Sequence, residues 1–333
     1  MNLQRRIAAI SLACFLILIG FLRLQPQNDF PSNKPGAEIN FVIADGELGS
    51  SIAANLEQSG VIKSATKFVE DFTKDPKAQG ISPGSHKIQL HIPAQTAIMQ
   101  LLDPKRLNNL LVIKEGSTVS DVLAELRAND HISKSNTSYG TVASIYPESA
   151  KSLEGSLFPA HYSFEPNTTI AKALSAMVAK AKAEYFAAGL NSGFGKYKPY
   201  EVLKIASMVQ IEGDPKNFDK VARVIYNRLD IGMALQLNST VQYAANLRGK
   251  ITLSNKATQI DSPYNTYKRV GLPPTPISNP SRDAIAAALK PASGDWLYFI
   301  TVLPGDTRFT KDFAEFSNWN TEFNRNVAAG KFK

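Results

Sequence analysis

The sequence predicts an α+β protein with an N-terminal transmembrane helix, a small α+β region and a mainly helical C-terminal domain with a few strands. Three observations predict this arrangement: an uncharged apolar run near the N-terminus, a 22-residue segment that occurs twice, and a C-terminal half rich in helix-favouring stretches that end at glycine or proline. With 333 residues, 44% of them hydrophobic, the chain is long enough for two domains of ordinary size.

The N-terminal segment 1–24 has the pattern of a membrane anchor. Two arginines precede a run of sixteen uncharged residues, Ile7 to Leu22, and a third arginine follows it. This length is near the lower limit for crossing a bilayer, and no A-x-A cleavage site follows, although a cleaved signal peptide is the alternative. The arginines favour a cytoplasmic N-terminus, so we expect a single-pass protein of the cytoplasmic membrane with its other domains extracytoplasmic. Residues 25–38 are expected to form a polar, proline-rich linker.

The net charge and the residue composition exclude several classes of function. The net charge of +8 favours acidic partners, but no block of Lys and Arg interleaved with aromatic residues occurs, so we do not expect nucleic-acid binding. The single cysteine, Cys14, cannot form an internal disulfide. After His161 the chain has neither His nor Cys, which excludes Ser-His, Cys-His and histidine-ligated zinc chemistry from that part. Carboxylates, hydroxyls and amides remain.

Residues 41–62 align without gaps with residues 111–132, at an offset of 70. Each copy has the pattern of a short apolar strand, an acidic-Gly turn whose glycine has positive φ, and a helix capped by a serine, Ser50 or Ser120. We therefore expect one α+β region at 39–135. It is either a spacer with its own core or a carbohydrate-binding module, and the pattern does not choose between them.

One carboxylate stands out in the C-terminal half. The segment "ASMVQIEGD" (206–214) places Glu212 at the end of an apolar helix, on the edge of the stripe that faces the core. Three interpretations stay open: an exposed residue of the last turn, a buried carboxylate paired with Arg223 or Arg228, or an acid with a raised pKa at the floor of a cleft. The helix dipole opposes the first of these.

Two polar segments follow this helix. The first is rich in amides and hydroxyls, and the second places tyrosines and an asparagine in a stiff, proline-rich loop. Such side chains suit sugar recognition, whereas the alternative is a surface loop whose tyrosines pack against the core. An apolar stretch at 296–302 predicts a strand. The candidate sugar-binding residues are Gln236, Asn238, Thr240, Tyr264, Asn265 and Tyr267.

Taken together, four segments resemble the endolytic murein (peptidoglycan) lytic transglycosylases of the YceG-like family. The resemblance implies a YceG-like catalytic domain at 145–330 and a LysM-like region at 39–135 behind the single membrane span. Such enzymes cleave MurNAc–GlcNAc bonds within nascent glycan strands and leave 1,6-anhydro-MurNAc ends, using one glutamate as acid and then base, without metal or cofactor. The segments are "LEGSLFPAHY" (153–162), "IASMVQIEG" (205–213), "VIYNRLDIGMALQLNSTVQY" (224–243) and "SPYNTYKRVGLPPTPISNP" (262–280).

Carried onto this chain, the resemblance makes Glu212 the acid/base and adds Glu154 to the substrate-binding residues. It also implies peptidoglycan glycan strands, the cell membrane and possible peptidoglycan synthases as partners. The chain departs from the family pattern at Ala160 and Asn238, which replace acids, and at Phe316, which replaces a histidine. A non-catalytic peptidoglycan-binding scaffold and a muramidase-type hydrolase are the alternative functions.

Overall fold

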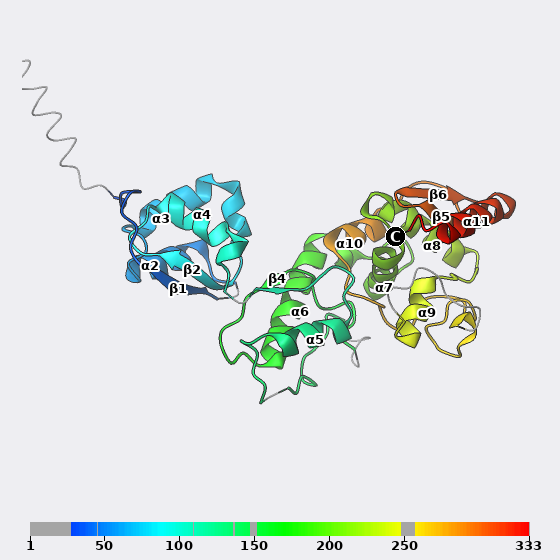
Figure 1. Cartoon of the computed structure of the whole chain (residues 1–333), viewed down its shortest axis with the longest axis horizontal. Helices are drawn as coiled ribbons and strands as arrows, with labels where there is room; N and C mark the ends of the chain where they lie inside the picture. Colours follow the sequence, from blue (N-terminus) through cyan, green and yellow to red (C-terminus); the bar gives the residue numbers. More distant parts are fainter. Residues whose placement is uncertain are drawn as a thin grey trace, which may run out of the picture. The chain divides into compact units, whose positions relative to one another are not determined.

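The computed structural model describes residues 28–44, 46–108, 110–135, 137–146, 152–247 and 257–332 (Figure 1). The chain forms two compact units, Met1–Asn108 and Asn109–Lys333. The predicted transmembrane helix at 1–24 lies outside the described residues. None of the helices that are described is both long and apolar enough to span a bilayer.

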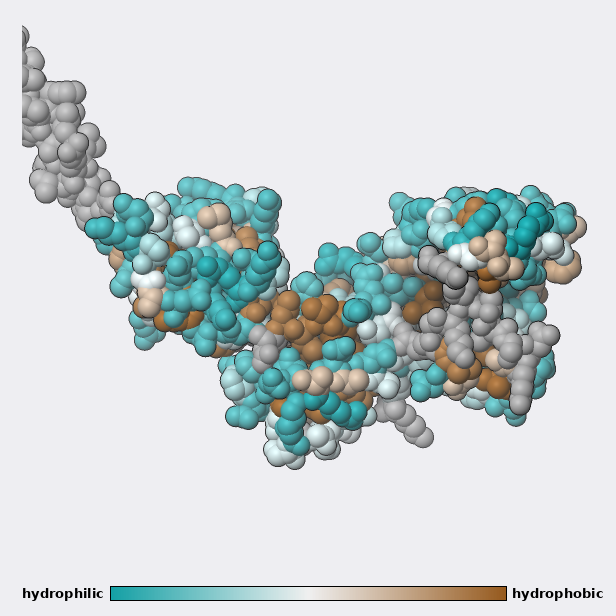
Figure 2. All heavy atoms as spheres, in the orientation of Figure 1, coloured by the Kyte–Doolittle hydropathy of each residue, from teal (hydrophilic) through white to brown (hydrophobic). Residues whose placement is uncertain are grey.

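The first unit packs three helices against a two-stranded sheet. Strands β1 (Glu38–Ile43) and β2 (Gly84–Gln89) are antiparallel, with Glu38 opposite Gln89. Apolar side chains from both strands and all three helices form its core, and hydrophilic residues cover most of the face of this unit that Figure 2 shows. The helices are α2 (Gly49–Gln58), α3 (Ala65–Lys74) and α4 (Ala94–Leu102), with 3₁₀ turns η1 (Pro76–Gly80) and η2 (Pro104–Arg106).

The two copies of the repeat fall in different units. The boundary at 108/109 lies inside the range 39–135 that we predicted as one region. In the second copy, the apolar residues of β3 (Leu111–Val112) and α5 (Val119–Ala128) pack with side chains from further along the chain, including Leu174 of α6 (Ile170–Ala187). The glycine of each turn does have positive φ, 74° in the first copy and 75° in the second.

The prediction that serines cap these two helices was wrong. Ser50 and Ser120 lie inside the first helical turn. The cap of α5 is Thr118, whose hydroxyl accepts from the Asp121 amide while Asp121 accepts from the Thr118 amide. This reciprocal pair satisfies two free donors at once, which outweighs a single serine bond. Helix α2 begins after Leu48, without a side-chain cap.

The second unit is mainly helical, with two small antiparallel sheets. One pairs β3 with β4 (His161–Tyr162), and the other pairs β5 (Tyr298–Leu303) with β6 (Asp306–Thr310). Its helix α6 ends before Gly189, which has φ 95° as expected of a helix-terminating glycine. The predicted strand at 296–302 appears as β5, shifted by one or two residues. The elements are β4 (His161–Tyr162), α6 (Ile170–Ala187), η4 (Leu190–Ser192), α7 (Pro199–Glu212), η5 (Pro215–Asn217), α8 (Phe218–Asp230), α9 (Asn238–Ala245), η6 (Ala257–Gln259), α10 (Arg282–Leu289), β5 (Tyr298–Leu303), β6 (Asp306–Thr310) and α11 (Phe313–Ala328).

Helix α7 runs through the largest core of this unit. Val202, Ile205 and Val209 are fully buried, in contact with α8 and α10, as the apolar stripe predicts. Gly213 follows the helix and packs so closely against Phe218 that a Cβ there would lie 2.7 Å from the ring. The end of α7, and therefore the position of its last residue, is fixed by this close contact.

Candidate active site

Polar residues on the last turns of α7 have defined partners. Ser207 Oγ accepts a hydrogen bond of 3.1 Å from the Ile277 amide, and Gln210 Oε1 accepts one of 2.8 Å from the Ser281 amide. These bonds hold the proline-rich loop and the start of α10 against α7. Gln210 is therefore a structural residue, and Glu212 is the carboxylate near the end of α7 that reaches a cavity.

Glu212 is the last residue of α7, and its carboxylate lies at the start of helix α9. Its Oε1 accepts a 2.9 Å hydrogen bond from the backbone amide of Ser239. Burial raises the pKa of the Glu212 carboxyl, while the Ser239 hydroxyl, the Ser239 amide and the charge of Arg228 act in the opposite direction. The net shift is upward, so this carboxyl keeps its proton to a higher pH than an exposed glutamate.

Arg228, on α8, faces the same cavity but does not form the ion pair with Glu212 that was one interpretation of the sequence. Its Nε donates to the Leu297 carbonyl at 2.6 Å and its Nη1 to the Leu235 carbonyl at 2.5 Å. The guanidinium also lies over the Tyr298 ring, 5.3 Å from its centroid. Because the Arg228 guanidinium is bonded to backbone carbonyls, its positive charge lowers the Glu212 pKa without a hydrogen bond to the carboxylate oxygens.

The cavity beside Glu212 has a volume of about 520 Å³, large enough for part of an oligosaccharide. Its walls combine one carboxylate, one guanidinium, amides and an array of aromatic rings. Among its described lining residues Glu212 is the only carboxylate. The lining consists of Glu212, Arg228, Gln236, Leu237, Asn238, Tyr267, Tyr298, Phe299, Ile300, Thr301, Phe313, Phe316, Asn320, Phe323 and Phe332.

Three of the predicted sugar-binding residues line this cavity with Glu212. Gln236 is exposed and has φ 51°, a conformation that non-glycine residues seldom adopt. Its backbone N–H donates a 3.0 Å hydrogen bond to the Thr266 carbonyl. Asn238 Oδ1 accepts a 2.6 Å hydrogen bond from the Tyr267 hydroxyl. The pKa of Tyr267 is raised by burial and by the nearby Glu212 charge, so its hydroxyl stays a proton donor.

The other four predicted residues lie elsewhere and make structural contacts. Thr240 and Asn265 are fully buried, and the Asn265 side-chain amide donates to the carbonyls of Thr258 and Ile260. Tyr264 is partly buried, and its hydroxyl lies 2.8 Å from Thr275 Oγ1.

Glu154 is 3% exposed and bonds the Val119 amide and the Tyr243 hydroxyl. The burial and bonding of all four residues favour a role in shaping the loops over the sugar contact predicted for them.

Sequence reasoning missed the aromatic wall opposite Glu212. Tyr298 of β5 stacks on Phe316 of α11 with ring centroids 5.1 Å apart, and Phe313 is 64% exposed beside them. The spacing of Phe313, Phe316, Asn320 and Phe323 places them on one face of α11, which is a signal that the sequence does contain.

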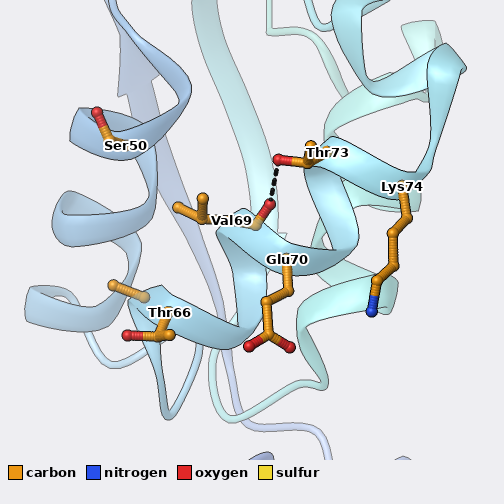
Figure 3. Close-up of a pocket in the computed structure, with 7 residues that line it drawn as sticks. Ser50, Thr66, Val69, Glu70, Thr73 and Lys74 are labelled. Carbon is orange, nitrogen blue, oxygen red and sulfur yellow. Dashed lines mark hydrogen bonds between the residues drawn. The ribbon is translucent and has the colours of Figure 1, made fainter.

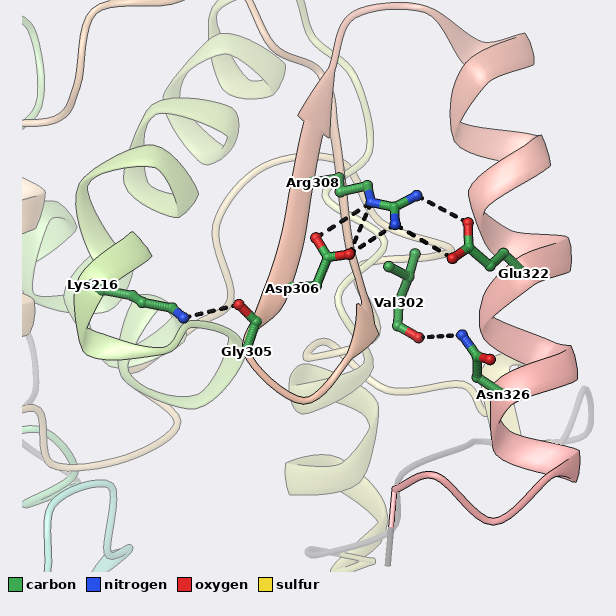
Figure 4. A network of polar contacts seen from close by, with 7 residues as sticks. All are labelled: Lys216, Val302, Gly305, Asp306, Arg308, Glu322 and Asn326. Atoms are coloured by element: carbon green, nitrogen blue, oxygen red, sulfur yellow. Dashed lines mark hydrogen bonds and ion pairs between the residues drawn. The ribbon is translucent and has the colours of Figure 1, made fainter.

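A polar network holds this wall in place (Figure 4). Arg308 of β6 bonds Asp306 at 2.7 Å and Glu322 of α11 at 2.9 Å. The buried Asn326 of α11 donates to the Val302 carbonyl at 2.8 Å. Lys216, just beyond the end of α7, donates a 2.9 Å hydrogen bond to the carbonyl of Gly305, which lies in the turn between β5 and β6. The wall is thereby tied to the segment that follows Glu212.

The first unit has a separate hollow of about 630 Å³ along helix α3 (Figure 3). Thr66, Val69, Glu70 and Thr73 line it, together with Ser50 of α2. The Thr73 hydroxyl bonds the Val69 carbonyl of its own helix at 2.7 Å.

Within the described part of the chain, no group of three His, Cys, Asp or Glu residues could hold a metal ion.

Comparison with known proteins identifies the family. The model of the YceG-like family matches residues 41–322. The chain belongs to this family. It is 30% identical to the endolytic murein transglycosylase of Bacillus subtilis (strain 168) over 298 residues, which cover 83% of this chain and 82% of that protein.

The endolytic murein transglycosylase of Streptococcus pneumoniae serotype 2 (strain D39) is 35% identical over 227 residues, covering 65% of this chain but 40% of the pneumococcal protein. A crystal structure at 2.6 Å of a YceG-like protein from Listeria monocytogenes has a TM-score of 0.55 and 29% identity, covering 85% of this chain and 99% of that one. The YceG-like resemblance is therefore confirmed.

Proposed function

We propose that this chain is an endolytic peptidoglycan transglycosylase in which Glu212 is the sole acid/base. The observation that carries the proposal is a single carboxylate whose pKa is raised by burial, in a cavity walled by aromatic rings and amides. Family membership and the names of the relatives support the same activity. Glu212 in its protonated form is suited to give a proton to a glycosidic oxygen.

The reaction that fits one carboxylate has two proton transfers. Glu212 protonates the oxygen between MurNAc C1 and GlcNAc, the C1–O bond breaks, and GlcNAc leaves with a free hydroxyl. The Glu212 carboxylate then removes the proton from the MurNAc 6-hydroxyl, whose oxygen bonds to C1 and closes the 1,6-anhydro ring. Glu212 ends protonated, as it began. Hydrolysing glycosidases need a second carboxylate as nucleophile or to activate water, and among the described lining residues none is present.

The remaining cavity residues would bind the strand. Tyr298, Phe313 and Phe316 offer flat apolar faces to sugar rings, while Gln236 and Asn238 offer amide groups to sugar hydroxyls. Arg228 places positive charge beside the carboxylate that forms when Glu212 gives up its proton. We further propose that a single N-terminal span anchors the enzyme, that catalysis is extracytoplasmic, and that peptidoglycan synthases supply the nascent strands.

Product analysis tests the proposal. Purified glycan strands incubated with the full chain should yield 1,6-anhydro-MurNAc ends by mass spectrometry, and Glu212→Gln should lower the rate at which they form by at least about a hundredfold. Asp214→Asn is the matched control, because this exposed carboxylate is two residues away and outside the cavity lining. Reducing ends would show a hydrolase instead, and binding without any cleavage would show a scaffold.

A further inference from the structure

The contact between Glu212 and Ser239 distinguishes the two oxygens of the carboxyl group. Oε1 accepts the Ser239 N–H at 2.9 Å, and no hydrogen bond to Oε2 is formed by the residues that the structure describes. A backbone N–H bonds the carbonyl oxygen of a protonated carboxyl group more strongly than its hydroxyl oxygen, which is the poorer acceptor. When Glu212 is protonated, the proton therefore belongs on Oε2.

The side chain of Ser239 adds a second observation. The residue is 4% exposed, and its hydroxyl has no hydrogen-bond partner among the described residues, although it lies close enough to lower the Glu212 pKa. A buried hydroxyl without a partner is costly unless it gains one at some stage. The carboxylate formed when Glu212 loses its proton is a stronger acceptor for this hydroxyl than the neutral carboxyl group.

We propose that Ser239 is a positioning residue for Glu212: its backbone amide holds Oε1 so that Oε2 carries the transferred proton, and its hydroxyl stabilises the carboxylate formed after transfer. The inference rests on the proposed function, in which Glu212 is the acid/base. Ser239 itself is not among the residues that line the cavity.

Among the described residues, few other ionisable groups face Glu212. Arg228 of α8 lowers the Glu212 pKa, and Tyr267, from the loop before α10, is itself affected by the Glu212 charge. Tyr298 of β5 lines the same cavity beside Arg228. None of these three side chains is itself altered in the Ser239 variants, so a change in the Glu212 titration is attributed to Ser239.

The test compares three substitutions by direct titration. Ser239→Pro removes both donors while proline remains compatible with the first helical turn, and it should raise the Glu212 pKa by about one unit. Ser239→Ala keeps the amide and should give a smaller rise, and Ser239→Thr should restore the original value. The readout is the carbon-13 NMR signal of labelled glutamate in the detergent-solubilised full chain, assigned by its loss in Glu212→Gln.

Ser50→Pro is the matched control, since Ser50 also occupies the second residue of a helix but lies in the other unit. It should leave the Glu212 titration unchanged. In the pH–rate profile, activity falls as pH rises through the pKa of the acid, so Ser239→Pro should move this alkaline limb upward. An unchanged Glu212 pKa in Ser239→Pro, or failure of threonine to restore it, would overturn the inference. Absence of anhydro products from the native chain would overturn the proposed function instead, and the titration would still decide the role of Ser239.

Discussion

Arg228→Met should remove two hydrogen bonds that join α8 to the neighbouring segments. The arginine is 7% exposed, and it donates to the carbonyls of Leu235 and Leu297. Each buried carbonyl left without a donor costs about 1–3 kcal/mol, so the substitution should lower the free energy of unfolding by about 2–6 kcal/mol. In a unit of this size each kcal/mol lowers Tm by roughly 2–4 °C, which gives a fall of about 4–24 °C.

Thermal unfolding followed by circular dichroism measures this fall, and Arg325→Met on the exposed face of α11 is the control, expected within about 1 °C. Loss of the Arg228 charge should also raise the Glu212 pKa and move the alkaline limb of activity upward. Arg228→Lys keeps the charge and should leave that limb in place while still losing part of the stability. A Tm for Arg228→Met within 2 °C of the native value would contradict the hydrogen-bond account.

Phe316→Ala should raise KM for glycan strands on the order of tenfold, equal to about 1.4 kcal/mol, with little change in kcat, because the ring binds substrate and transition state alike. Steady-state kinetics on strands of defined length measure this change, and an unchanged KM would show that the aromatic wall does not contribute to substrate binding. Glu212→Gln should also raise Tm relative to the native chain at alkaline pH but not at acidic pH. The native carboxyl ionises at its ordinary pKa when unfolded but keeps its proton to higher pH when folded, so it destabilises the fold as pH rises through that window. Equal Tm differences at pH 4 and pH 9 would contradict the raised pKa.

Local patterns predicted the helices of the second unit well. The apolar stripe of α7 and the glycine after α6 follow from spacing and backbone preference, and both appear where expected. The packing partners of each copy of the repeat could not be predicted from local patterns in the same way. Each copy has the same local plan, but the second packs its apolar face on α6 and the segment near Leu157, which are contacts that no local pattern contains.

The aromatic wall was missed for a different reason. Tyr298 lies in a strand and Phe316 on an amphipathic helix, and in each case burial in a core is the ordinary outcome for an aromatic residue. What brings them to the cavity is the pairing of β5 with β6 and the packing of α11 on β5. Asn265 and Thr240 were predicted to contact sugar because they are polar. Polar side chains in loops are as often used to hold the loop as to bind a ligand, and these two form hydrogen bonds within the protein.

Two glutamates of this unit show which property separates a structural carboxylate from a catalytic candidate. Glu154 accepts the amide of Val119 at the start of α5, as Glu212 accepts that of Ser239 at the start of α9. The second oxygen of Glu154 is taken by the Tyr243 hydroxyl at 3.0 Å, whereas the Glu212 carboxyl lines an open cavity. A carboxylate whose two oxygens both accept from protein donors is stabilised in its ionised form and is poorly placed to give a proton to a substrate. Both residues lie beside glycine in the sequence, so this difference arises from the fold, and it favours Glu212 as the acid.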